Sequence, residues 1–284
     1  MTRFIFATSF FFMTTVLALT PAYAGAAKSG AAKSGVTEDA KAAFALGDKD
    51  KAVAMITAAA EKGDVDAQVA LGIMYDEGQN VPKDPALAFS WLRRAADQNH
   101  AQAQYLVGEA YKAGAGVLKD EAEALKWRRQ GANNGYVPGQ SALGYEYANG
   151  IGVQRDESEA AAWFRKAAEK GDASAQNFLG EAYAAGKGVT RDDHAAEKWF
   201  KAAAAQGHVP AQFNLGQHYV NAATTPKPNL VLGYMWLDVA ATQGDAPSAI
   251  IRDATAKRMT PDDLKRAQAA AKTCVAAKYK NCAP

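Results

Sequence analysis

Between residues 173 and 207 the apolar residues recur at intervals of three and four, in two runs separated by a short turn. Gly186 and Gly188 interrupt the first run, Asp192 precedes the second, and Gly207 follows it. Such spacing is typical of amphipathic helices, because positions three and four apart share one face. Capping Asp and glycine residues are frequent at helix ends. The segment is therefore predicted to form a helical hairpin.

The same pattern returns every 36 residues. Each unit has a Gln, a Leu-Gly or Val-Gly pair and a Tyr in its first predicted helix, and a Trp in its second, the last Trp being displaced by one residue. The recurring residues are Gln68, Gln104, Gln140, Gln176 and Gln212; Leu71, Val107, Leu143, Leu179 and Leu215; Tyr75, Tyr111, Tyr147, Tyr183 and Tyr219; and Trp91, Trp127, Trp163, Trp199 and Trp236. Periods of 20 to 50 residues are typical of solenoids. The predicted fold class is therefore all-α, an α/α solenoid of helical hairpins with a 36-residue period.

Some recurring residues have evident structural duties. Gly180 lacks a Cβ and should let two helix axes approach, while Gly186 and Gly188 suit positive φ. The first unit has Asn80 in place of the second loop glycine, and Asn is the next most tolerant residue in the left-handed region. The tyrosines and tryptophans are predicted to form the core between successive helices, because an aromatic side chain buries ~150 to 250 Å². The alternative for the tryptophans is ligand stacking.

These residues carry a resemblance to a known family. The pattern A-x-A-Q-x-x-L-G-x-x-Y-x-x-G-x-G-V-x-x-D-x-x-x-A-x-x-W resembles the Sel-one-like repeat (SLR), a relative of the tetratricopeptide repeat, and covers five units: 65–100, 101–136, 137–172, 173–208 and 209–245. The resemblance implies a right-handed α-solenoid that acts as an adaptor in protein complexes. Exported bacterial members imply roles in envelope signalling, exopolysaccharide or envelope assembly, or contact with a host.

The ends of the chain depart from the repeat. Residues 1–24 have Arg3, an apolar run and a small-residue triplet, the three parts of a signal peptide, with cleavage expected after Ala24. The alternative is a retained anchor, but the apolar run is short for a membrane span, so no integral membrane segment is expected after cleavage. Residues 25–36 are predicted to be a flexible linker, 37–64 a degenerate hairpin cap and 246–284 a C-terminal helical cap. The protein is expected to be periplasmic or secreted.

The C-terminal region contains both cysteines of the chain, Cys274 and Cys282. An oxidising compartment would allow them to pair, and a bridge there would contribute roughly 2.5 kcal/mol on the chain-entropy model. The alternative, a zinc or redox pair, fits poorly because no CxxC motif or nearby His accompanies the thiols. Residues 252–284 are basic, and residues 221–229 form a divergent fifth loop. Either could contact a partner, although a solvated face and sequence drift are the simpler interpretations.

The sequence contains no recognisable motif for catalysis, for a cofactor or for a metal. We therefore expect no catalytic residues, no cofactor-binding residues and no metal site. The chain lacks HExxH, P-loop, GxSxG and SxxK motifs. His100, His194, His208 and His218 are interpreted as surface or hairpin residues. His194 and His218 could approach each other across neighbouring repeats, but they have no evident carboxylate partner. A net charge of +2 argues against a nucleic-acid binder. The leading hypothesis is a non-enzymatic scaffold. The alternatives are an enzyme acting on the cell wall or β-lactams, as in cysteine-rich relatives, and a structural envelope component.

The relationship to tetratricopeptide hairpins also implies a partner-binding surface. There the first helix lines the concave face, through residues two before and two after the leucine of the Leu-Gly pair. The first row is Val69, Tyr105, Ser141, Asn177 and Phe213, and the second is Ile73, Glu109, Tyr145, Glu181 and Gln217. Both rows vary from unit to unit, whereas the residues between them recur. Aromatics beside carboxylates suit a protein or extended peptide with apolar and basic groups, although an unused groove would also drift.

Overall fold

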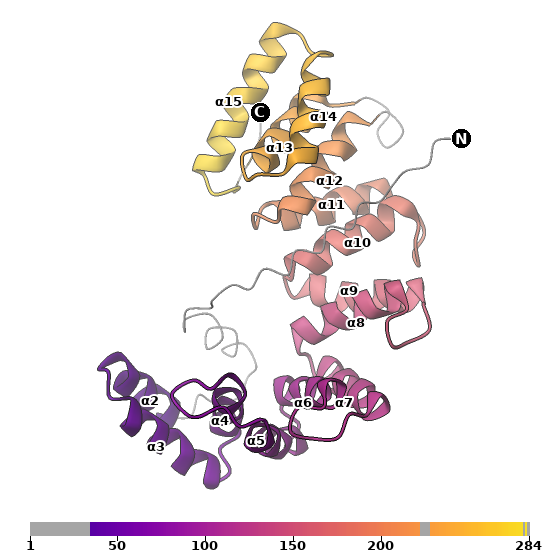
Figure 1. Ribbon diagram of the computed structural model, residues 1–284. Coiled ribbons are helices and arrows are strands. Elements are labelled where there is room, and N and C mark those ends of the chain that lie inside the picture. Colours follow the sequence, from indigo (N-terminus) through magenta and orange to yellow (C-terminus); the bar gives the residue numbers. More distant parts are fainter. Residues whose placement is uncertain (1–34, 222–227, 281, 283–284) are drawn as a thin grey trace.

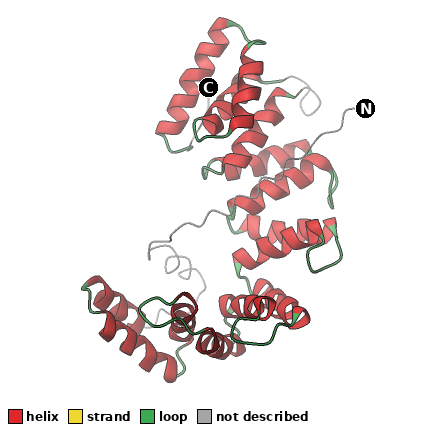
Figure 2. Ribbon diagram, in the orientation of Figure 1, coloured by secondary structure: helices red, strands yellow, loops and turns green. Residues whose placement is uncertain are grey.

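The computed structural model describes residues 35–221, 228–280 and 282, and these form fourteen helices joined by turns. Figure 1 shows the helices stacked in sequence order along a curved array, and Figure 2 shows no strand among the described residues. The helices are α2 (Gly35–Ala45), α3 (Lys49–Glu61), α4 (Val65–Glu77), α5 (Pro85–Asp97), α6 (Ala101–Ala113), α7 (Glu121–Asn133), α8 (Val137–Asn149), α9 (Glu157–Glu169), α10 (Ala173–Ala185), α11 (Asp193–Ala204), α12 (Val209–Val220), α13 (Leu230–Ala241), α14 (Ala246–Ala256) and α15 (Pro261–Ala276).

Local sequence determines where these helices begin and end. Asp192 accepts hydrogen bonds from the first backbone N–H groups of α11, as its position predicts. Gly186 ends α10 in the left-handed conformation with φ of 66°, and Asn80 takes the same region in the first loop with φ of 59°. In the first four hairpins a left-handed glycine ends the first helix, and an Asp caps the second.

The two helices of each hairpin touch at the recurring glycine. A Cβ on Gly180 would come within 2.6 Å of the Phe200 ring, so only a residue without a side chain permits this approach. The facing residue follows the recurring Trp directly in every unit, but its identity varies. It is Leu92, Arg128, Phe164, Phe200 and Leu237 in units one to five.

The recurring glutamine links one unit to the next. Gln104 is fully buried; its amide donates to Ala96 O at 3.2 Å, and its Oε1 accepts from Asn134 Nδ2 at 2.7 Å. Since buried polar groups require partners, this pair fixes the register between α5, α6 and the end of α7. In the third unit Lys170 replaces the donor, and the Oε1 atom of Gln140 is buried without a partner among the described residues.

The aromatic residues contribute to the core to different degrees. Trp127, Trp163 and Trp236 are buried, whereas Trp91 and Trp199 are half-buried. Basic side chains cover several of the rings, as Lys166 does over Trp163 with Nζ 3.7 Å from the centroid. The tryptophans are therefore largely structural, as the sequence predicted, with part of two rings left at the surface.

The C-terminal helix α15 packs on α13 instead of extending the array. Thr260 caps it and Pro261 opens it, as predicted. A disulfide joins Cys274 to Cys282, with Cα atoms 4.7 Å apart. Tyr279, inside this loop, lies against Gly207 at the end of the fourth unit. The tail is thus fixed to the body of the solenoid at two points.

The structure confirms the predicted all-α solenoid of hairpins. The signal peptide and most of the linker, predicted at residues 1–24 and 25–36, lie outside the described residues, as do residues 222–227 of the divergent fifth loop. Within the described residues, no helix is long and apolar enough to cross a membrane.

Candidate partner-binding surface

The two predicted rows lie on the first helices of the five repeat units, α4, α6, α8, α10 and α12, and we call this surface the first-helix face. Its residues are not equally accessible. Val69 is only 6% exposed and packs in the core with Leu92, and Asn177 is 3% exposed. Glu181 is exposed, and the remaining members are half-buried: Ile73, Tyr105, Glu109, Ser141, Tyr145, Phe213 and Gln217.

Contacts across the first-helix face connect neighbouring units. Asn214 Nδ2 donates to Asn177 Oδ1 at 3.0 Å and to Glu181 Oε1 at 2.8 Å. Asn177 Nδ2 also donates to Glu181 Oε1 at 2.8 Å. Surrounding protein raises the pKa of Glu181 by desolvation, and these hydrogen bonds oppose the shift. The predicted rows therefore share a surface with Asn214, which sequence analysis had not included.

Aromatic rings line the middle of the first-helix face. Tyr145 and Phe178 have centroids 6.1 Å apart across two units, and Phe178 stacks on Phe164 at 4.9 Å. Tyr105 lies 5.2 Å from Tyr136. A Cβ on Gly139 would clash with the Tyr105 ring at 2.8 Å, so that ring is held against the next first helix. Burial raises the pKa of Tyr105, because a charged phenolate would be unfavourable inside this packed contact.

A buried charge cluster between the second and third units was missed by sequence analysis. Arg128 is 4% exposed at the position where other units have Leu or Phe, and its guanidinium forms a short ion pair with Glu146, which is 6% exposed. Arg128 also contacts Glu109 at 3.3 Å, and Lys112 lies 3.6 Å from Glu146. The predicted groove residue Glu109 is thus engaged by the core of its own unit. The signal was a charged residue at an apolar register position.

The histidines are not all surface residues. His100 and His208 accept from the backbone N–H groups of Ala103 and Ala211 through Nδ1, both at 3.3 Å, and so cap α6 and α12. His218 is 5% exposed and lies 3.9 Å from Glu197. The interpretation of His218 as a surface residue without a carboxylate neighbour was wrong. His218 lies on the side of α12 that packs against α11, the helix that contains Glu197. The described residues contain no group of three metal-ligating side chains close enough to hold an ion.

The repeated hairpins, the shared core and the varied first-helix face define the protein as a helical-repeat solenoid. The Sel1 repeat family matches residues 43–64, 65–100, 101–136, 137–172, 173–208 and 209–245. The chain belongs to this family. Sel1 repeat proteins generally mediate protein–protein interaction and are typically non-catalytic scaffolds.

Two solved structures are similar to this chain over most of its length. One is a protective antigen of uropathogenic Escherichia coli strains that displays an SLR fold, with 33% identity and a TM-score of 0.69 over 80% of this chain. The chain spans about half of that antigen, 49%. The other is a Sel1 repeat protein from Oxalobacter formigenes, with 28% identity, a TM-score of 0.64, and coverage of 77% of this chain and 87% of that one. Among curated proteins, no sequence matches.

Proposed function

We propose that this protein is an exported, non-enzymatic scaffold of the bacterial periplasm or exterior that binds an extended segment of a partner protein on its first-helix face. The predicted signal peptide and the Cys274–Cys282 disulfide support export. The non-catalytic character typical of the family supports a binding role. We propose that binding of this partner regulates envelope signalling, or exopolysaccharide or envelope assembly.

The observation that carries the proposal is the contact of varied side chains across repeat boundaries. Tyr145 and Phe178 offer half-buried aromatic surface, and the cluster around Glu181 offers amide and carboxylate groups one unit further on. Half-buried aromatic side chains are frequent anchors at interfaces, and polar groups beside them provide specificity. An extended segment with apolar side chains, followed by a basic or amide group, would match this order.

The test is capture of a partner by mature protein from envelope extract, followed by binding measurements with a Tyr105→Ala, Tyr145→Ala, Phe213→Ala triple variant. Truncating anchors typically weakens binding by more than 1 kcal/mol each, so we expect a loss of at least about a hundredfold in affinity. A matched control is Tyr75→Ala, which removes a recurring Tyr outside the two rows. Unchanged affinity in the triple variant, with unchanged helicity and melting, would remove the first-helix face as the binding surface.

A further inference from the structure

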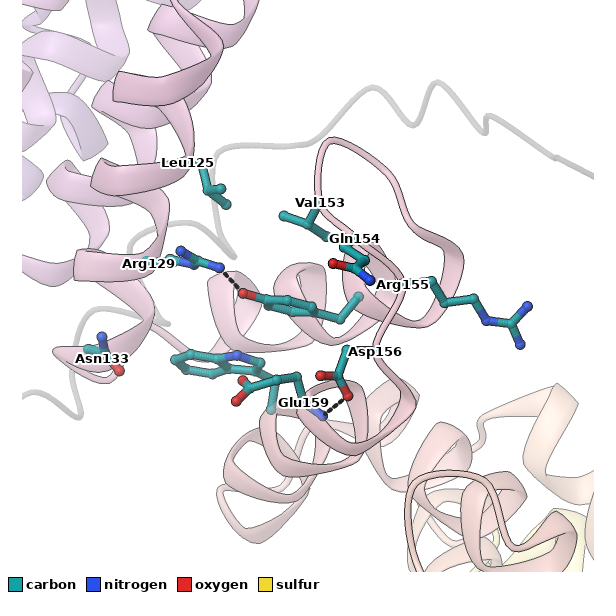
Figure 3. A pocket seen from close by; sticks show the side chains of 10 residues that line it. Leu125, Arg129, Asn133, Val153, Gln154, Arg155, Asp156 and Glu159 are labelled. Carbon is teal, nitrogen blue, oxygen red and sulfur yellow. Dashed lines mark hydrogen bonds between the residues drawn. The ribbon is translucent and has the colours of Figure 1, made fainter.

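Two clefts of the same construction lie on another side of the solenoid, between the second helices of successive hairpins. The larger, about 670 Å³, is lined by Leu125 and Arg129 of α7, by Tyr147 and by the loop that contains Arg155. Figure 3 shows Leu125, Arg129 and Asn133 on one side and Val153 to Asp156 on the other. The second cleft, about 460 Å³, has the equivalent residues 36 positions later, including Arg165, Tyr183 and Arg191.

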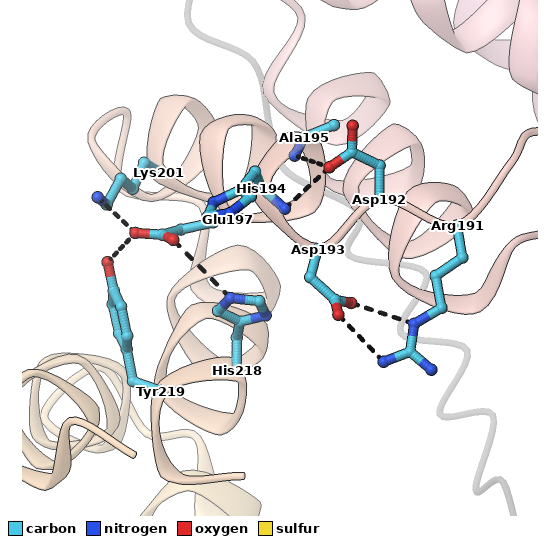
Figure 4. Close-up of polar contacts among 9 residues, drawn as sticks. All are labelled: Arg191, Asp192, Asp193, His194, Ala195, Glu197, Lys201, His218 and Tyr219. Atoms are coloured by element: carbon cyan, nitrogen blue, oxygen red, sulfur yellow. Dashed lines mark hydrogen bonds and ion pairs between the residues drawn. The ribbon is translucent and has the colours of Figure 1, made fainter. Parts of the chain in front are cut away.

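In the units on either side, the chain places its own side chains at this position. The second helix of each of the first four units has a basic residue at the equivalent position: Arg93, Arg129, Arg165 and Lys201. The residues one helical turn before these are Phe89, Leu125, Ala161 and Glu197. Phe89 packs edge-on against Tyr111 with centroids 5.4 Å apart. Glu197 accepts hydrogen bonds from Tyr219 OH at 2.6 Å and Lys201 Nζ at 2.7 Å (Figure 4). Leu125 and Ala161 provide no such group, and both clefts described above lie in the units that contain them.

The Glu197 arrangement shows which chemistry the tyrosine and the basic residue can bind together. Burial favours the neutral form of Glu197, but the hydrogen bonds from Lys201 and Tyr219 outweigh it, and its pKa is lowered. Burial and the bond to Glu197 also raise the pKa of Tyr219 to about 12, so the phenol is a stable donor. A carboxylate at this position is therefore held in its charged form by one phenol and one cation.

In the open clefts the equivalent arginine and tyrosine bond to each other, and neither bonds to a carboxylate of the described residues. Arg165 Nη2 donates to Tyr183 OH at 2.9 Å, and Arg129 donates to Tyr147 OH. Neither Arg129 nor Arg165 has an ion pair with a described residue, whereas Arg93 in the first unit binds Asp97 at 3.0 Å. Each cleft thus has a guanidinium available for a charged acceptor.

We propose that these two clefts bind carboxylates of an acidic, extended segment of a partner protein, one carboxylate in each cleft. The ligand group takes the place that Glu197 occupies in the fourth unit. The clefts are one repeat apart, and a first helix packs between the second helices that carry them, so their spacing exceeds the about 8–10 Å between two packed helices. Because an extended chain advances about 3.3–3.6 Å per residue, acidic residues more than about three positions apart would reach both clefts. The site lies on the second helices and does not depend on the first-helix face.

Neighbouring charges make the two clefts differ in their expected affinity for a carboxylate. Glu159 lines the larger cleft, and its negative charge opposes an incoming carboxylate, whereas Ala195 stands at the equivalent position beside the second cleft. Asp156 and Asp192 also line the clefts, but each caps its own helix by accepting two backbone N–H groups. The second cleft is therefore the stronger carboxylate site.

The experiment uses mature full-length protein and a fluorescently labelled synthetic peptide with two Glu residues in a Gly/Ser host, prepared with the two Glu residues three, four, five or six positions apart. Fluorescence anisotropy at low ionic strength should show saturable binding. The Gln version of the peptide should bind at least about tenfold more weakly, the value of one charge-assisted hydrogen bond. Arg129→Gln with Arg165→Gln should weaken the Glu peptide by a similar factor or more, and both arginines are exposed, so folding should be unaffected.

A second variant tests the arrangement itself. Leu125→Glu should place a carboxylate between Arg129 and Tyr147 and reduce peptide binding, while Leu125→Gln, matched in size, should reduce it less. The Tyr105→Ala, Tyr145→Ala, Phe213→Ala triple variant should bind the acidic peptide with the same affinity as the parent. Equal binding of the Glu and Gln peptides, full binding by the double arginine variant, or no saturation at millimolar peptide would each overturn the proposal.

Discussion

Gly108 lies directly against the side chain of Arg128: a Cβ at residue 108 would come within 2.4 Å of Arg128 Cγ. The aliphatic part of the arginine side chain therefore fills the interhelical position that a Leu side chain or a Phe ring fills in the other units. Its guanidinium continues past the glycine to Glu146 and Glu109. An interhelical contact that is apolar elsewhere is ionic here, and it joins two repeats.

Arg128→Leu should destabilise the protein by about 3 kcal/mol, because it leaves Glu146 buried without its main cation. Lys112, 3.6 Å from Glu146, moderates the loss. Arg128→Leu with Glu146→Ala recreates the Leu92 and Ala110 pair of the preceding unit, and its stability should return to the parent value or exceed it. Urea unfolding of both variants measures the effect. A double variant as unstable as the single one would show that the charges themselves stabilise this interface.

Acidification should destabilise the solenoid through His100 and His208. Desolvation lowers the pKa of both, against the opposing effects of Asp66 and Asp172. Near and below the unfolded-state pKa of about 6.5, the unfolded chain therefore binds more protons than the folded one. The contribution of the two neutral histidines to stability is therefore fully present above about pH 6.5. It is lost as the pH decreases from about 6.5 towards their lowered pKa values in the folded protein. Protonation of Nδ1 also abolishes the two caps.

The matched variant for this prediction is His100→Asp with His208→Asp, since Asp64 and Asp172 already cap the equivalent helices. Melting temperatures measured from pH 7.5 to pH 5 should fall less in the variant than in the parent. His218 accounts for a remaining slope, because burial lowers its pKa as well. An identical slope in parent and variant would contradict the role of the capping histidines.

Trp163→Ala should destabilise the protein by ~3 to 5 kcal/mol, as deletion of a buried aromatic usually does. Trp163 is 6% exposed and packs with Leu143, Tyr147 and Leu179 in a core shared by the third and fourth units. Hydrogen exchange should show increased opening of α8 and α10 together, because each interface supports the next. Trp199→Ala, at a half-buried position, should cost less. Equal melting of parent and Trp163→Ala would revive a ligand-stacking role.

Much of the fold could be predicted from sequence because the recurring residues have purely local or pairwise duties. Asp192 caps a helix, Asn80 takes positive φ and Gly180 faces its partner helix, and each of these follows from residue chemistry and the period. The course of α15 could not be predicted, because no repeat governs it and its buried side chains are all small: Ala267, Ala270, Ala271 and Cys274.

The candidate surface was less predictable than the fold. A periodic pattern identifies which positions vary, but burial depends on side chains from the next unit. Val69 is covered by Leu92 and its neighbours, while Asn214, one position from a predicted row, bonds to Asn177 across the boundary. Arg128 carried a detectable signal, since comparison with Phe164 and Phe200 at the same register reveals a charge in the core.

Lys170→Gln should stabilise the protein. In the other four units an amide at the end of the second helix donates to the recurring Gln, at 2.6 to 2.9 Å. The third unit has Lys170 there, which bonds to Gly135 O at 3.1 Å, while Gln140 Oε1 is buried without a partner among the described residues. A new amide donor would satisfy that atom and contribute about 0.5 to 1.5 kcal/mol.

Lys170→Ala is the control, because it removes the exposed lysine and its contact to Gly135 without supplying a donor. Thermal and urea unfolding should rank Gln above Lys and Ala at this position, and Gln206→Lys, which makes the converse change in the fourth unit, should destabilise by a similar amount. The converse variant matters because Lys170 is exposed, and removing its charge alone can change stability slightly. If Gln and Ala at position 170 gave the same stability, the amide pair would have no role in joining successive repeats.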